Sequence, residues 1–159
     1  RYETERYGEY SKPGEFVYDH PFLWGSRRIG PDLAREGGKY NNLWQVNHLK
    51  DPRSVTPRSI MPAYPGLFTG SIDWPSVQKH VDGMAMLGVP YGDLVQDGKA
   101  IVDAKAQAGT IADDLAATGG QAGLQDKEIV ALVAYLQRLG TDIKQAGAVA
   151  QQPRLLGGF

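Results

Sequence analysis

The sequence predicts a mainly α-helical fold, and three observations support this. No stretch of the chain alternates apolar and polar residues in the way that marks a half-buried strand. The second half is rich in Ala, Asp, Gln and Lys and is divided by glycines, which is typical of helices separated by glycine stops. The first 75 residues hold 12 of the 15 aromatic residues and 8 of the 10 prolines, which predicts a loop-rich front half.

Two helices are expected in the front half. The first is short, with Pro31 near its start and Gly37-Gly38 at its end, since proline suits the first turn and glycine the stop. The second is capped by Asn41 or Asn42 and cannot continue past Asp51-Pro52. Its apolar stripe consists of Leu43, Val46 and Leu49 or Lys50.

A third helix is expected to begin after a cap at Asp73 and to end at Gly88, shortly before Pro90. The residues predicted to share its apolar face are Trp74, Val77, Val81 and Met84. Met84 is therefore interpreted as a packing residue.

The last helix has the clearest sequence pattern. Asp126 is its expected cap, Arg138 suits the dipole of its last turn, and Gly140 is the expected stop. Its apolar face comprises Ile129, Leu132, Val133, Leu136 and Leu139.

We expect a single domain made of four consecutive segments. Residues 1–70 form loops and short helices that include a Met-Pro segment, and 71–123 form a helical insertion. Residues 124–142 hold the last helix, and 143–159 form a tail. The Ala- and Gly-rich part from Ala104 to Gly123 is expected to be mobile.

Composition excludes several classes of function. Seventeen basic and eighteen acidic residues give a net charge of -1, without the basic excess of a nucleic-acid binder. The longest apolar run, Ile129–Leu136, is far shorter than the roughly 20 residues of a membrane span. The absence of cysteine excludes disulfides, thiolate metal sites and cysteine nucleophiles. Because it begins at Arg1 without a signal peptide, the chain is interpreted as a fragment or processed form.

Known catalytic patterns do not fit the chain. The segment Gly92–Ala100 has the wrong glycine spacing for a phosphate loop and Ala where Ser or Thr should bind magnesium. Asp19, His20 and Ser26 lack the Gly-x-Ser-x-Gly turn of a hydrolase. Adjacent carboxylates such as Asp113-Asp114 are interpreted as solvated charge. No enzymatic activity of this chain alone is expected.

The segment Pro57–Pro65 has the most unusual chemistry. Three prolines in nine residues forbid a helix, so Met61 is expected on a stiff extended strap that can aim its side chain. A thioether is a soft ligand suited to iron, and Met opposite His is the axial pair of cytochrome c haems. The alternative is that Met61 fills a gap in the core, as most methionines do.

The order of these motifs resembles the class I cytochromes c. A Gly30-Pro31-Asp32-Leu33 loop precedes the Met-Pro strap, and an aromatic-bearing helix follows at the end. A narrower resemblance is to the membrane-anchored monohaem subunit of cbb3-type cytochrome c oxidases. It is close from Arg6 to Leu67, loose from Leu87 to Gly92, and close again from Asp126 to Gly140. The stretches that carry it are Arg6–Ser11, Glu15–Arg28, Gly30–Tyr40, His48–Val55 and Met61–Pro65.

This resemblance implies a class I cytochrome c-like fold and electron transfer. The monohaem subunit would relay electrons from the dihaem cytochrome c subunit toward the haem-copper catalytic subunit, which reduces oxygen. It would lie on the periplasmic face of the bacterial inner membrane. An alternative of a different class is a haem-free assembly or interaction module on the same scaffold.

The resemblance also implies a set of haem-binding residues. Met61, followed by Pro62, would be the distal iron ligand, while the loop of Gly30, Pro31 and Leu33 would back the proximal histidine. The carbonyl of Pro31 could accept that histidine's Nδ1–H. Arg27 or Arg28 could meet a haem propionate. Side chains that could exclude water from the porphyrin edge, or simply fill the core, are Trp24, Tyr40, Trp44 and Tyr64.

The chain departs from the family in lacking the C-x-x-C-H attachment motif. The resemblance places that motif, a membrane helix and the first cytochrome helix upstream of the position of Arg1. Haem c is therefore expected in the full-length protein, and no covalent haem in these residues. None of His20, His48 and His80 is expected to substitute as proximal ligand. Without the first helix, two copies are expected to pair through Leu132, Tyr135, Leu136 and Leu139, and the alternative is that the Pro- and aromatic-rich front half collapses into the vacated haem cleft.

Overall fold

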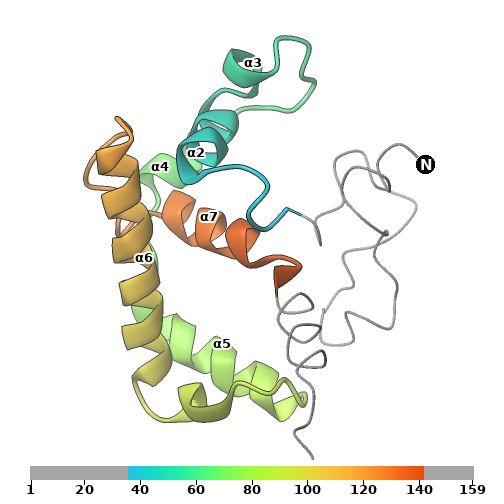
Figure 1. The fold of residues 1–159 in the computed structure, drawn as a ribbon. Coiled ribbons are helices and arrows are strands. Elements are labelled where there is room, and N and C mark those ends of the chain that lie inside the picture. Colours follow the sequence, from blue (N-terminus) through green and yellow to red (C-terminus); the bar gives the residue numbers. More distant parts are fainter. Residues whose placement is uncertain (1–35, 142–159) are drawn as a thin grey trace, which may run out of the picture. The chain divides into compact units, whose positions relative to one another are not determined.

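The computed structural model describes residues 36–141, and the secondary structure in that range is helical apart from one antiparallel bridge between Ser71 and Lys127. The mainly α prediction is therefore confirmed. The chain divides into two compact units. One comprises 1–39 and 136–159, of which only 36–39 and 136–141 are described, and the other is Tyr40–Tyr135 (Figure 1). The four predicted segments remain a prediction.

Three of the predicted helices are present, together with further short elements and one long helix. The expected helix from Pro31 begins outside the described residues, and its expected end lies in a turn in which Gly38 has φ 73°. In chain order the elements are α2 (Asn42–Lys50), α3 (Pro52–Val55), α4 (Gly66–Thr69), α5 (Trp74–Met86), the 3₁₀ helix η3 (Gly92–Val95), α6 (Lys99–Ala117) and α7 (Glu128–Arg138).

Helix α2 begins and ends where the sequence predicts. The Asn41 side chain accepts a hydrogen bond of 2.8 Å from the Trp44 N–H, so Asn41 is the cap. The helix ends at Lys50 because Asp51 leaves the helical conformation before Pro52. On its apolar stripe Val46 and Leu49 are buried.

Helix α5 ends in a motif that needs glycine. Gly88 has φ 92°, and its N–H donates to the carbonyl of Ala85 while the Val89 N–H donates to the carbonyl of Met84. These two bonds form a Schellman motif, which satisfies the last carbonyls of the helix. At the other end Asp73 takes the predicted N-cap position, but its side chain makes no capping bond.

Helix α6 is the main element that the sequence analysis did not place. Its 19 residues bury Ala100, Ala108, Ile111 and Leu115 on one side. Ala is the best helix former, and its small side chain lets α6 pack closely on α5. This burial outweighs the loss of helix stability caused by the central Gly109. The expected mobility of Ala104–Gly123 remains a prediction.

Helix α7 supplies the centre of the core. Ile129, Val130 and Val133 are fully buried. Leu124, which precedes the helix, is only 2% exposed. The helix begins at Glu128, so Asp126 lies before the cap position rather than on it. Gly140, with φ 73°, follows the helix as predicted. Figure 1 shows α7 lying between α2 and α6.

One buried polar side chain joins α5, η3 and α6. Gln78 is 8% exposed, and its Nε2 donates to the carbonyl of Leu94 and to Asp82 Oδ1, each at 2.9 Å. Its Oε1 accepts the N–H of Ala100 at 3.1 Å. A buried amide that uses both ends in this way fixes the three elements together.

Replacing Gln78 should therefore destabilise the fold. Gln78→Ala leaves the Ala100 N–H and the Leu94 carbonyl without their partner, which should lower the unfolding free energy by about 1–3 kcal/mol. Urea unfolding followed by circular dichroism measures this. Gln107→Ala is the matched control, because Gln107 is exposed and bonds only Asp103 one turn away at 2.7 Å. An equal loss in both variants would contradict the role given to Gln78.

Candidate functional site

The strap that carries Met61 is neither helix nor strand. Residues 59–64 have no regular secondary structure, which agrees with the effect expected of the three prolines. A turn precedes the strap, closed by a 2.8 Å bond from the Ser59 N–H to the Thr56 carbonyl. Helix α4 follows it, with Pro65 at its N-cap. Met61 itself is half-buried.

One backbone bond ties the strap to α2, and a second bond lies within the strap at Met61. The Tyr64 N–H donates to the Leu49 carbonyl in the last turn of α2 at 3.0 Å, so strap and α2 lie side by side (Figure 1). The Met61 N–H donates to Ser59 Oγ at 3.2 Å. These bonds limit where the Met61 side chain can reach.

Helix α3 joins the strap to α2 through Asp51. One oxygen of the Asp51 carboxylate accepts the Arg53 N–H at 3.1 Å, and the Asp51 carbonyl accepts the Ser54 hydroxyl at 2.7 Å. Pro52, which follows, is fully buried. A single capping residue therefore ends α2 and begins α3.

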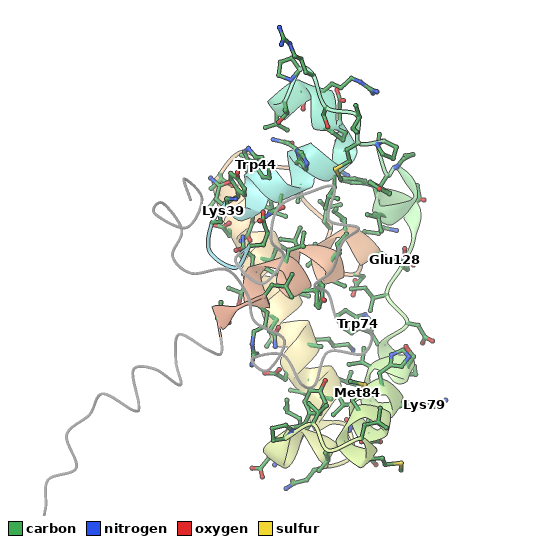
Figure 2. All side chains as sticks on the ribbon, turned by 90° about the vertical axis from the view of Figure 1, so that its right-hand side faces the viewer. Lys39, Trp44, Trp74, Lys79, Met84 and Glu128 are labelled. Atoms are coloured by element: carbon green, nitrogen blue, oxygen red, sulfur yellow. The ribbon has the colours of Figure 1, made fainter. Side chains whose placement is uncertain are left out.

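Beyond α4 the chain is held against the start of α7. The Ile72 N–H donates to the Asp126 carbonyl at 2.9 Å, and Lys127 Nζ donates to the Thr69 carbonyl at 3.0 Å. The indole N–H of Trp74 donates to the Asp126 carboxylate at 3.0 Å. Figure 2 shows Glu128 at the start of α7 near Trp74 at the start of α5. This clamp connects the strap to the most buried helix.

Three aromatic rings stack along one side of α2. Tyr40 and Trp44 have centroids 3.8 Å apart, Trp44 and His48 4.6 Å apart, and both pairs are nearly parallel. Nδ1 of His48 is buried and has no hydrogen-bond partner. The spacing of four residues could have revealed the pair of Trp44 and His48, because both lie in α2 and residues i and i+4 share a helix face, whereas Tyr40 precedes the Asn41 cap.

The structure brings together only part of the predicted site. Tyr40 and Trp44 are half-buried in the stack, whereas Pro62 is exposed and Tyr64 is 42% exposed on the strap. His80 is exposed on α5, as expected. Several predicted site residues lie outside the described range: Trp24, Arg27, Arg28, Gly30, Pro31 and Leu33. His20 lies outside it as well.

The described residues also bear on metal sites, membrane spans and the pairing of two copies. Within residues 36–141 no three His, Asp or Glu side chains gather as a metal site. No helix in the same range has the length and apolar character needed to cross a bilayer. On α7, Leu132 is half-buried and Tyr135 is 48% exposed, and pairing through this face remains a prediction.

The donor chemistry of this region fits a haem in part. Met61 offers a soft thioether on a tethered strap, and His48 offers a buried polar nitrogen without a partner. These 159 residues contain no cysteine, so none of them can form a thioether bond to a haem vinyl group.

The helices of residues 36–141 and the tethered Met-Pro strap are consistent with the class I cytochrome c-like domains. Comparison with protein families makes the assignment specific. Residues 1–143 match the model of the family described as cytochrome C oxidase, mono-heme subunit/FixO, and the chain belongs to this family. The resemblance to the monohaem oxidase subunit is thereby confirmed, and with it a role in electron transport. A search of the curated proteins finds no match.

The cap at Asp51 yields a prediction about the strap. Asp51→Ala should lower the unfolding free energy by about 1 kcal/mol and raise amide hydrogen exchange at Arg53 and Tyr64, because it frees the start of α3. The control is Asp73→Ala at the N-cap of α5, whose side chain makes no capping bond. Exchange measured by NMR at the two helix starts should differ between the variants, and equal effects would contradict the tether.

Proposed function

We propose that the chain is the electron-relay domain of a cbb3-type oxidase, taking electrons from the dihaem cytochrome c subunit and passing them toward the haem-copper catalytic subunit. The family match supports the class of protein, and the tethered strap with its half-buried Met61 is the structural observation that supports the site. The chain itself carries electrons, and oxygen reduction belongs to the catalytic subunit.

In this proposal Met61 is the axial ligand of a haem. A bound haem would supply a one-electron centre, and the Met61 thioether as an iron ligand would raise its potential. The strap holds Met61 because the prolines and the Tyr64 tether limit its movement. Trp44 and Tyr40 are bulky enough to exclude water beside the haem, which also favours the reduced state through a lower local dielectric.

The proposal also covers where the domain lies and how its haem is attached. A haem c held through thioether bonds requires cysteines that these 159 residues do not contain. We place the domain at the periplasmic face of the bacterial inner membrane, anchored through another part of the protein. The loop of Gly30, Pro31 and Leu33 remains proposed for the proximal side, and Arg27 or Arg28 for a propionate.

The test is Met61→Ala in the assembled, haem-bearing oxidase. Loss of the thioether should open the axial position, lower the midpoint potential and remove the weak sulfur-to-iron charge-transfer band at the red end of the spectrum. Absorption spectra of the oxidised subunit and a redox titration measure both effects.

The other methionines provide the controls for this test. Met84 is half-buried on α5 and Met86 is 88% exposed, so Met84→Leu and Met86→Leu should leave band and potential unchanged. A band that persists in Met61→Ala would show that Met61 is not the ligand. An unchanged spectrum and unchanged electron flow, with loss of assembly only, would instead favour the haem-free interaction module.

The chain of 159 residues produced alone should contain no covalently bound haem. It has no thiol for the vinyl groups, and Met61 by itself is too weak a ligand to retain iron. A purified sample should be colourless after extraction with acidified acetone. Stoichiometric haem that resists this extraction would contradict the prediction.

A further inference from the structure

Charge is distributed unevenly within the unit Tyr40–Tyr135. Residues 52–72, which comprise α3, the strap and α4, contain two arginines and no carboxylate. Residues 73–126, which contain α5 and α6, have eight aspartates and three lysines. Helix α3 and α5 lie at opposite ends of this unit in both views (Figures 1 and 2). The unit thus has a basic end at residues 52–72 and an acidic end at α5 and the start of α6, whereas Asp113 and Asp114 lie at the far end of α6, where Asp114 accepts a hydrogen bond from Asn42 of α2.

The basic end also exposes apolar surface. Arg53 on α3 and Arg58 in the following turn are exposed, and no described carboxylate pairs with either. On the strap that follows them in the sequence, Ile60 is 84% exposed and Tyr64 is 42% exposed. Lys50 is exposed as well, with its ammonium 6.0 Å from the Phe68 ring. We call these five residues the strap surface: Lys50, Arg53, Arg58, Ile60 and Tyr64.

We propose that the strap surface docks a protein surface that has an apolar centre and a rim of carboxylates, on another subunit of the oxidase. Unpaired cations would steer such a partner and set its orientation, while Ile60 and Tyr64 would be desolvated at the centre. Arg and Tyr are among the residues that most often dominate binding energy in interfaces. This inference rests on the proposed function in one respect, because the partner is sought within the oxidase complex.

The strap surface is already ordered before a partner binds. Pro57, Pro62 and Pro65 restrict the backbone, and the Tyr64 tether holds it to α2. Side chains on such a backbone lose less conformational entropy when they are buried against a partner. A small surface can then dock without a folding step, which suits contact with a rigid subunit.

A protein partner explains this surface better than a lipid membrane does. Binding to anionic lipid headgroups is typical of clusters of about four to eight Lys or Arg. The strap surface has three cations, and the carboxylate of Asp51 lies between Lys50 and Arg53 in the sequence. The exposed Ile60 and Tyr64 instead provide the apolar centre of a protein interface.

The test measures association of the full-length, haem-bearing subunit with an oxidase core prepared without it. Arg53→Glu/Arg58→Glu should lower the association rate constant about tenfold at low salt, and the difference should shrink as salt screens the charges. Arg53→Lys/Arg58→Lys should keep the rate, since the charge is retained. Ile60→Ser should raise the dissociation rate constant several-fold with little dependence on salt.

Matched controls decide between the possible outcomes. Lys79→Glu/Lys99→Glu makes the same change of charge at the acidic end and should leave association unchanged. An equal loss in this control, or no loss in the arginine variant, would overturn the inference. Loss of sedimentation with phosphatidylserine vesicles, with unchanged association to the core, would assign the surface to the membrane and also overturn it.

The same samples separate this inference from the proposed function. The sulfur-to-iron band depends on Met61 and not on the charges of Arg53 and Arg58, so it should persist in the charge-reversed subunit. A band that survives Met61→Ala would refute the proposed ligand while the association rates still test docking. Unchanged association rates together with a normal band would refute docking alone.

Discussion

Leu49 connects the core of the described unit to the strap. Its side chain is 6% exposed in the core, while its carbonyl accepts the Tyr64 N–H at 3.0 Å. Because the side chain cannot move without opening a cavity, the carbonyl is a fixed acceptor. The path of the strap, and with it the position of Met61, therefore depends on how firmly α2 is packed.

Several contacts outside the strap hold α2 in place. Asn42 on its first turn donates a hydrogen bond of 2.8 Å to Asp114 of α6. Leu43 packs against Gly120, where an added Cβ would lie 3.2 Å from the leucine methyl and 2.9 Å from the Leu115 carbonyl. Gly120 also donates to that carbonyl in the turn that ends α6. The insertion thus helps to position the strap although it is distant in sequence.

Residues that cap or stop a helix explain which helices could be predicted. Asn41 at the start of α2 and Gly88 at the end of α5 act through backbone geometry within a few residues, and both are where the sequence places them. A helical insertion was expected over 71–123, but the bounds of α6 were not predicted, because two of its four buried residues are alanines and no side chain caps its start. The roles of Gln78 and Asp126 depend on partners 16 to 52 residues away, which no local pattern reveals.

In the candidate site too, features set by neighbouring residues could be predicted, whereas contacts between distant residues could not. Proline spacing predicts the irregular strap around Met61, and the stack of Trp44 with His48 follows from helical periodicity once α2 is placed. The tether to Leu49 requires knowledge of the packed core, and so could not be predicted. Pro62 and Tyr64 are exposed in the described structure, and their contact with a haem stays a prediction.

Exposure on one side of the strap and burial on the other are connected physically. A strap tethered by backbone bonds to α2 presents side chains in two directions, so Met61 can be half-buried while Ile60, its neighbour, is almost fully exposed. In the proposed electron carrier, the segment that bears the iron ligand would also be the docking segment, which would shorten the distance between donor and acceptor. The tethers that orient the thioether would then also orient the partner, and a shift of the strap would alter both together.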